Sequence, residues 1–148
     1  MDKVEFKKGL EGLLDKWRDC RGFDSIVLDK IKLEEAEIGK LVCSMIVTPD
    51  ICNIYSTLHG GAMATVVDVI SSLAVLSMNK DATFKPSVSV EISVNYASAA
   101  KMNSKVYIYS SCYKEGKNLA FTETVLKNEK DEVICKGSHT KFILKPKL

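Results

Sequence analysis

An apolar run between residues 62 and 78 is the feature that most limits what this chain can fold into. Asp68, Ser71 and Ser72 interrupt the run, and charged residues follow it. Its length is at the short limit for crossing a bilayer, and the polar residues inside it favour a core helix over a membrane span. A helix that is apolar on nearly every side must be covered, so we expect a sheet around it.

The composition fits one domain and argues against several functions. A chain of 148 residues is long enough for a single domain with its own core. The net charge of +2 is too small to make nucleic acid the main partner. The five cysteines are scattered and form no C-x-x-C pair, which favours a reducing compartment over a disulfide framework. Acidic residues near the N-terminus argue against a signal peptide or mitochondrial presequence. A cytoplasmic protein is expected, with mitochondria as the alternative.

Two helices are expected. Residues 2–21 carry apolar side chains at helical spacing, with Asp2 in position to cap the first turn. We expect this helix to be a lid or flank that depends on docking. Ser56 or Thr57 is placed to cap the central helix, which should run to about Asn79.

Six strands are expected between turn residues: about 25–34, 39–48, 87–96, 104–114, 118–127 and 132–144. In 87–96 apolar and polar residues alternate strictly, which places Ser89 and Glu91 together on a polar face. Residues 34–37 are predicted to be a polar turn, and short connections favour antiparallel pairing. The predicted class is therefore α+β, with an antiparallel sheet of about six strands around one long central helix, plus the N-terminal helix.

Residues around the start of the central helix are candidates for chemistry, and their spacing suggests one small reaction volume. Gly60 and Gly61 would leave helix N–H groups open to a substrate, and such groups stabilise an oxyanion. Asn53 offers a side-chain donor for the same oxygen. Asp68 would be costly to bury without a role, so it is a candidate to orient or deprotonate a water. Ser89 could hold that water or the carboxylate.

The same residues also have structural interpretations. Paired glycines often mark a tight turn, a buried aspartate can accept backbone hydrogen bonds, and Ser89 can be an ordinary strand serine. His59 and His139 have no second ligand at metal spacing, so no metal site is expected. No G-x-S-x-G elbow or glycine-rich phosphate loop is present. Cys52 has no nearby base and is better explained as a packed cysteine than as a nucleophile.

Four motifs lie in register between about residues 41 and 141. They are Asn53-x-x-x-Thr57-Leu58-His59-Gly60-Gly61-x-x-Ala64-Thr65-x-Val67-Asp68, Ser87-Val88-Ser89-Val90-Glu91-Ile92-Ser93-Val94-Asn95-Tyr96, Lys114-Glu115-Gly116-Lys117-Asn118-Leu119-Ala120-Phe121-Thr122 and Gly137-Ser138-His139-Thr140-Lys141. Together they resemble the hotdog-fold acyl-CoA thioesterases, in the branch of thioesterase superfamily member 2 and the phenylacetyl-CoA thioesterases.

The resemblance implies a hotdog fold and an active site at the interface of a homodimer, which usually pairs again into a homotetramer. It implies acyl-CoA hydrolysis in lipid metabolism without a metal, a further cofactor or a covalent intermediate. By position, Gly60 would donate its N–H to the thioester oxygen, Asn53 would help to polarise it, and His59 would support the turn. Asp68 would be the general base or water-orienting group, and the partner subunit's Ser89 would help to place the water.

The resemblance also implies substrate and CoA contacts at Gly61, Tyr96, Ala97, Ser98, Lys101, Lys114, Gly116, Lys117, Asn118 and Leu119. Medium- to long-chain fatty acyl-CoA is the expected substrate. Two alternatives stay open at this point. One is an enoyl-thioester hydratase or dehydratase of the same fold, and the other is a non-catalytic acyl-CoA binding protein.

Overall fold

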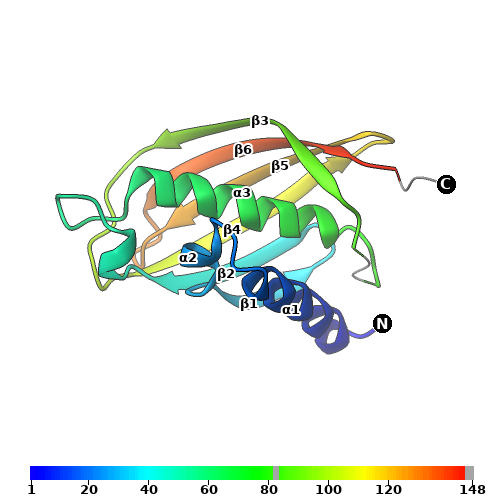
Figure 1. Cartoon of the computed structure of the whole chain (residues 1–148), viewed down its shortest axis with the longest axis horizontal. Helices are drawn as coiled ribbons and strands as arrows, with labels where there is room; N and C mark the ends of the chain where they lie inside the picture. Colours follow the sequence, from blue (N-terminus) through cyan, green and yellow to red (C-terminus); the bar gives the residue numbers. More distant parts are fainter. Residues whose placement is uncertain (82–83, 146–148) are drawn as a thin grey trace.

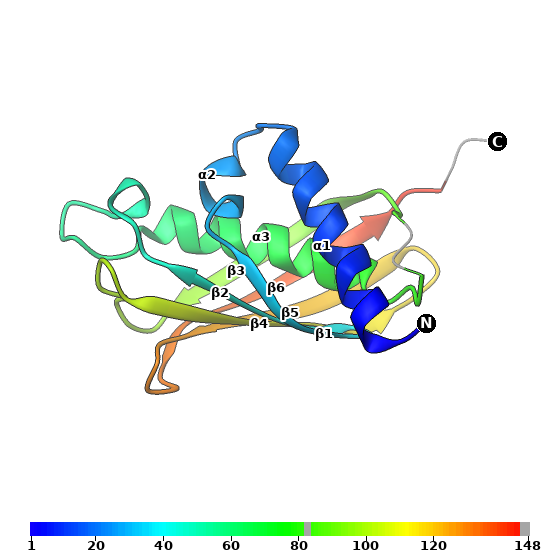
Figure 2. The ribbon, with the colours of Figure 1, turned by 90° about the horizontal axis from the view of Figure 1, so that it is seen from below.

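A single six-stranded sheet packs one face against a long helix. The computed structural model describes residues 1–81 and 84–145. The strand order is β1-β2-β4-β5-β6-β3, and every neighbouring pair is antiparallel. Helix α3 lies across the sheet (Figure 1), and α1 and α2 lie on the same side of the sheet as α3 (Figure 2). The predicted α+β architecture is confirmed.

The elements alternate along the chain as helices, a strand pair, the long helix and four strands. They are α1 (Lys3–Asp19), α2 (Ser25–Leu28), β1 (Lys32–Glu37), β2 (Lys40–Ile46), the 3-10 helix η1 (Pro49–Ile51), α3 (Gly60–Leu76), β3 (Ser87–Tyr96), β4 (Lys105–Glu115), β5 (Leu119–Lys127) and β6 (Val133–Ile143). Within these described parts of the chain, no helix combines the length and apolarity needed to cross a membrane.

Two expectations for the N-terminal strands are wrong. The predicted strand 25–34 begins with the short helix α2, and only its end belongs to β1. Val27 and Leu28 are both buried, which one helical turn allows, whereas a strand would point consecutive side chains to opposite faces. The predicted turn at 34–37 is part of β1. The chain reverses instead at Gly39, whose φ of +71° favours glycine.

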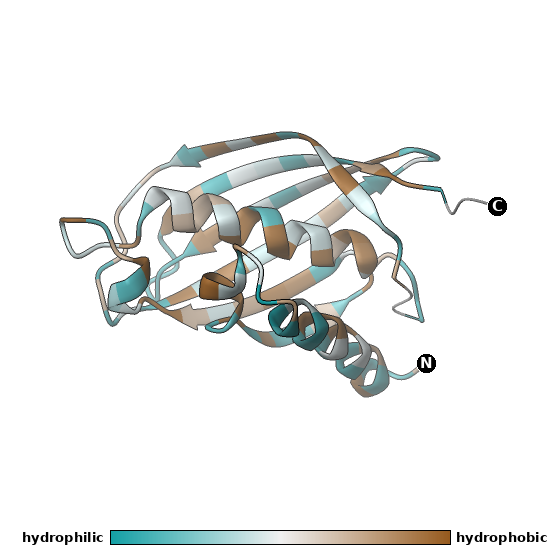
Figure 3. Cartoon of the chain, viewed as in Figure 1, coloured by the Kyte–Doolittle hydropathy of each residue, from teal (hydrophilic) through white to brown (hydrophobic). Residues whose placement is uncertain are grey.

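The central helix begins later and ends earlier than expected. Its N-cap is His59, whose Nδ1 accepts the Gly61 N–H at 2.8 Å. Ser56 and Thr57 lie in the preceding loop, where Ser56 has a φ of 58°, so the predicted cap is wrong. The helix ends at Leu76. Figure 3 shows apolar segments on α3 and on the strands behind it, as expected for a helix in the core.

A bulge in edge strand β3 changes which face Ser89 occupies. The pairing with β6 shifts from Ser89 opposite Lys141 to Glu91 opposite Thr140, which leaves Val90 as the extra residue. Residues directly opposite each other on paired strands point to the same face. Ser89 therefore points with Lys141 toward α3, and Glu91 points away. The alternation had placed both on one polar face, and the bulge makes that prediction wrong.

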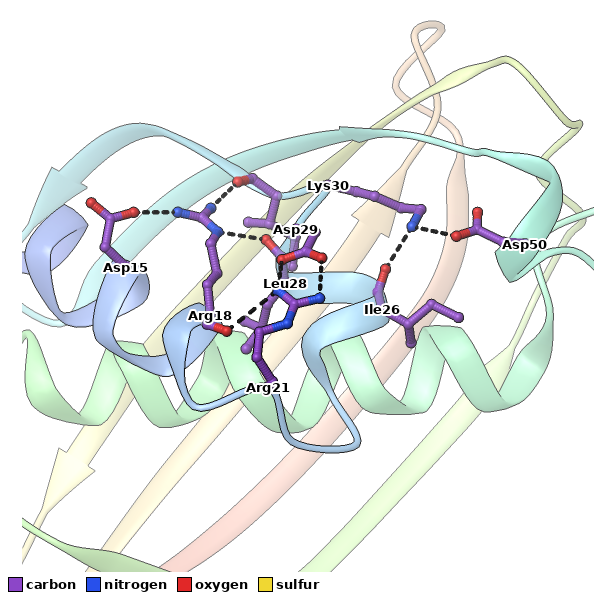
Figure 4. Close-up of polar contacts among 9 residues, drawn as sticks. Asp15, Arg18, Arg21, Ile26, Leu28, Asp29, Lys30 and Asp50 are labelled. Carbon is purple, nitrogen blue, oxygen red and sulfur yellow. Dashed lines mark hydrogen bonds and ion pairs between the residues drawn. The ribbon is translucent and has the colours of Figure 1, made fainter.

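Polar contacts fix the end of α1 against α2 and the start of β1 (Figure 4). The Arg18 Nε donates to the Leu28 carbonyl at 2.8 Å, and a second Arg18 nitrogen donates to the Ile31 carbonyl. Arg21 forms a two-pronged ion pair with Asp29, at 2.8 Å for each bond. The N-terminal helix is therefore clamped to the body of the domain at this end.

Candidate active site

At the start of α3, the Gly60 N–H is available to a ligand. Within residues 1–81 and 84–145, the Gly60 N–H has no hydrogen-bond partner, as expected for the first residue of a helix. The Gly61 N–H is occupied by the ring of His59. A Cβ added to Gly61 would lie 3.1 Å from the His59 Nδ1, so the absent side chain leaves room for that ring. Of the two predicted glycines, only Gly60 keeps a free donor.

Asn53 organises the loop that leads into the helix. Its Oδ1 accepts the N–H groups of Tyr55 and Thr57 at 2.9 and 3.2 Å. Its Nδ2 donates to the Thr57 Oγ1 at 2.9 Å. A primary amide has two N–H donors, so one remains for a substrate oxygen. Asn53, the predicted donor, therefore also stabilises the conformation of this loop.

The segment after β3 lies beside this loop. The Tyr96 hydroxyl donates to the Gly60 carbonyl at 2.9 Å. The Leu58 N–H donates to the Ala100 carbonyl at 2.8 Å, and Lys101 forms a β-bridge with the same loop. The structure therefore places the predicted CoA contacts Tyr96 and Lys101 next to the free N–H of Gly60.

The other predicted CoA contacts belong to two segments. Ala97 and Ser98 donate their N–H groups to the Ile134 carbonyl, at 2.9 and 3.0 Å. The remaining predicted residues form the turn between β4 and β5: Lys114, Gly116, Lys117, Asn118 and Leu119. This turn lies at the opposite end of β4 from Lys101, roughly 33 Å away at the usual rise per residue in a strand. One protomer therefore does not bring both CoA segments to Gly60.

Asp68 is not buried, contrary to the prediction. Its side chain is 51% exposed, because the sheet leaves this side of α3 open. It borders a groove of about 360 Å³, whose other walls include Trp17, Val69, Leu76 and Phe84. Eight residues of helix separate it from Gly60, or roughly 12 Å at 1.5 Å per residue. Within one chain, the two groups do not face one small reaction volume.

A polar cluster that the sequence interpretation missed lies next to Asp68. His139, on β6, is only 1% exposed. Its Nδ1 lies 2.7 Å from the Ser71 Oγ and 3.9 Å from the Asp68 Oδ1, and its Nε2 lies 2.7 Å from the Ser89 Oγ. Ser89 therefore belongs to the same cluster as Asp68 within one chain, which corrects the expectation that the partner subunit supplies it. From the sequence, His139 was considered only as a motif residue and as a possible metal ligand. The signal that could have found the cluster is the serine pair that interrupts the apolar helix.

Lys141 extends this cluster along the groove. It is 6% exposed, and its Nζ donates to the Ser72 Oγ at 2.6 Å. Burial lowers the pKa of Lys141, and the charge of Asp68 opposes that shift. Burial also lowers the pKa of His139, with a further lowering from Lys141 and an opposing effect of Asp68. The described part of the chain thus holds a neutral imidazole beside a carboxylate.

The described residues contain no group of three or more His, Cys, Asp or Glu side chains that could hold a metal ion. Cys52, which the sequence analysis considered as a nucleophile, is half-buried, and its Sγ contacts the Thr48 carbonyl at 3.4 Å. The groups at hand are therefore a free helix N–H, an amide donor, a carboxylate and a serine–histidine pair. Such a set can polarise a carbonyl and orient a water.

Comparisons with known proteins agree on one family. The family model described as Thioesterase superfamily matches residues 55–135. Human acyl-coenzyme A thioesterase 13 is 38% identical over 137 residues, which cover 92% of this chain and 95% of that protein. The crystal structure of zebrafish thioesterase superfamily member 2 has a TM-score of 0.82 at 36% identity, covering 90% of this chain and 94% of that one. A Streptococcus pneumoniae thioesterase crystallised with coenzyme A has a TM-score of 0.73 at 25% identity, covering 81% and 93%.

Proposed function

The chain belongs to the thioesterase superfamily, and from this premise we propose that it hydrolyses medium- to long-chain acyl-CoA by direct attack of water. It is a thioester hydrolase that acts on acyl-CoA. The observation that carries the finer proposal is the Asp68 carboxylate, which stands half-exposed at the wall of a groove with both apolar and polar lining residues. A carboxylate in that position can activate a water next to a bound acyl chain.

The reaction needs charge stabilisation at one atom and a base near another. The Gly60 N–H and the spare N–H of Asn53 would hold the thioester oxygen and stabilise the oxyanion. Asp68 would accept a proton from the water as its oxygen bonds to the carbonyl carbon. Collapse of the tetrahedral intermediate breaks the C–S bond, and the departing thiolate takes up a proton. The products are the free acid and CoA.

The geometry favours a site that is shared between two copies of the chain. Gly60 and Asp68 of one protomer are roughly 12 Å apart along α3, too far for one carbonyl and its attacking water. A site that combines Gly60 of one protomer with Asp68 of the partner subunit removes this separation. Edge strand β3 supports such a homodimer, because Val88, Val90 and Ile92 are 49%, 59% and 42% exposed. A homotetramer and a cytoplasmic location stay predictions.

The groove beside Asp68 supports an apolar acyl group as substrate. Trp17, Leu76 and Phe84 provide apolar walls, and its volume of about 360 Å³ falls in the usual range for small-molecule sites. For the CoA portion, Lys101 of one protomer and Lys117 of the partner subunit are exposed cations that could meet phosphates. The Streptococcus pneumoniae relative, crystallised with coenzyme A, is consistent with this assignment.

Thiol release from acyl-CoA of increasing chain length tests the proposal, with Asp68→Asn as the variant. The wild type should release CoA fastest from medium or long chains, because those bury apolar surface in the groove. Asp68→Asn should lower kcat by about 100-fold or more, the usual contribution of a general base. Asp131→Asn, an equal loss of charge on a remote turn, is the control. Circular dichroism should show that both variants are folded.

Two results would contradict the proposal. Asp68→Asn with near-wild-type turnover would remove the carboxylate from the mechanism. Hydration of an enoyl-CoA without thiol release would favour the hydratase alternative, and binding of acyl-CoA without any turnover would favour a binding protein.

A further inference from the structure

The hydrogen bonds around His139 define where its proton lies. Ser71 has one hydroxyl proton and is placed to donate it to the Asp68 carbonyl at 3.1 Å, so its oxygen is free to accept from the His139 Nδ1 at 2.7 Å. The Asp68 carboxylate, 3.9 Å from Nδ1, also favours a proton on that nitrogen. Burial keeps the ring neutral by lowering the pKa of His139. This arrangement favours the tautomer with the proton on Nδ1, which leaves Nε2 as an acceptor.

A bare Nε2 fixes the orientation of the Ser89 hydroxyl. The Ser89 Oγ lies 2.7 Å from Nε2, and with this tautomer only Ser89 can supply the hydrogen. Its single proton is then committed to the ring, and its oxygen can only accept from other groups. The β3 bulge makes the contact possible, because it turns Ser89 to the face that carries His139 and Lys141.

We propose that His139 is a positioning residue for hydrolysis, which holds Ser89 as a hydrogen-bond acceptor for the attacking water beside Asp68. The proposal rests on the proposed function. A water between Asp68 and Ser89 would donate one hydrogen to each and direct its lone pair at the thioester carbon. A Ser89 hydroxyl that donated to the water instead would draw electron density from the attacking oxygen and would leave one water hydrogen without this acceptor.

Two substitutions at His139 separate this role from a purely structural one. In His139→Gln, the side-chain amide oxygen reaches about as far as Nε2 and can still accept from Ser89. In His139→Asn, the shorter amide can still meet Ser71 but does not reach Ser89. We expect kcat for acyl-CoA hydrolysis to fall up to about 100-fold more in the Asn variant, the scale expected for a misplaced reacting group. KM should change little in either variant.

The order of the two variants decides the proposal. Hydrogen bonding to Ser71 alone would be met by asparagine at least as well as by glutamine, whereas the smaller volume of asparagine would appear as a lower melting temperature. Equal turnover, or more turnover in His139→Asn, would overturn the proposal while leaving the thioesterase function intact. If the wild type itself releases no thiol, the proposed function fails instead. Thermal unfolding of both variants shows whether each retains its fold.

A second test measures the effect of His139→Asn on kcat in a chain that already carries Ser89→Ala. If His139 acts through Ser89, His139→Asn should cost far less turnover in a chain that already lacks the serine hydroxyl. Full additivity of the two losses in kcat would overturn the proposal, because it would mean that His139 acts by another route.

The pH profile gives a third readout. Protonated His139 has N–H donors at both nitrogens, so it would turn the Ser89 hydrogen toward the water. The charged groups that face the ring are Asp68 and Lys141. Wild-type kcat should therefore fall with decreasing pH as His139 takes up a proton, and His139→Gln should keep its activity to lower pH. Identical acid limbs in the two proteins would overturn the proposal.

Discussion

At the scale of single residues, two buried basic side chains, His139 and Lys141, lie beside the half-exposed carboxylate of Asp68. His139 and Lys141 are 1% and 6% exposed, and burial of either in its charged form is unfavourable without partners. Each has them: the ring bonds Ser71 and Ser89, and the ammonium donates to Ser72. Asp68 also opposes the fall of both pKa values. In this cluster, burial disfavours the charged forms of His139 and Lys141, and the Asp68 carboxylate at the groove favours them.

This balance predicts a pH dependence of stability. The pKa of His139 is lowered by burial in the folded state, so below about pH 6.5, the ordinary pKa of histidine, the unfolded chain binds more protons. Its contribution is fully present above that pH and is lost as the pH falls through the folded pKa. The free energy of unfolding, from urea titrations, should drop more between pH 8 and pH 5 in the wild type than in His139→Gln. An equal drop would mean that the ring does not titrate on unfolding.

At the scale of elements, the catalytic groups depend on how α3 begins. His59 has φ −62° and ψ 135°, an extended conformation, and Gly60 is the first helical residue. The His59 ring occupies the Gly61 N–H and leaves the Gly60 N–H for a substrate. The helix dipole adds to the attraction for an oxyanion at this point. In the proposed reaction, the Gly60 N–H alone takes the role that the sequence analysis gave to the glycine pair.

Gly60→Pro isolates that donor. Proline lacks the N–H, suits the first position of a helix, and prefers an extended residue before it, as His59 is. The fold should survive, and kcat should fall about 100- to 1,000-fold, as for loss of one oxyanion donor. Gly60→Ala keeps the N–H, and its Cβ would lie an ordinary 3.4 Å from the Tyr96 ring, so it should retain far more turnover. Thiol-release rates that are equal in the two variants would exclude the Gly60 N–H from the reaction.

The sequence predicted the central helix and five of the six strands closely, because their hydrophobic patterns are long and regular. It misplaced the segment 25–34, where a single helical turn buries Val27 and Leu28 together. It named Ser89 but put it on the wrong face, since a bulge depends on pairing between strands and leaves no mark in the alternation. The cluster around His139 was missed for a similar reason, because its partners Ser71 and Ser89 come from other elements.

At the scale of the whole molecule, one chain supplies two half-sites that point to different places. The loop from Asn53 to Gly60 and the segment from Tyr96 to Lys101 form one half. Asp68 and its groove form the other, roughly 12 Å along the helix. The turn after β4 and the segment that contains Lys101 lie at opposite ends of that strand. In the proposed homodimer, a second copy of the chain completes each half.

Mixed dimers test this division directly. A dimer of one Gly60→Pro chain and one Asp68→Asn chain, purified through two different tags, should regain about half of the wild-type turnover, because a two-fold dimer has two equivalent sites and one of them is intact. Each homodimer should be inactive. The control pairs a wild-type chain with a Gly60→Pro/Asp68→Asn chain, which places one defect in each shared site, so this dimer should be inactive. If each site instead lay within one chain, the two mixed dimers would exchange their results, since the wild-type chain would keep a complete site and the complementary pair would have none.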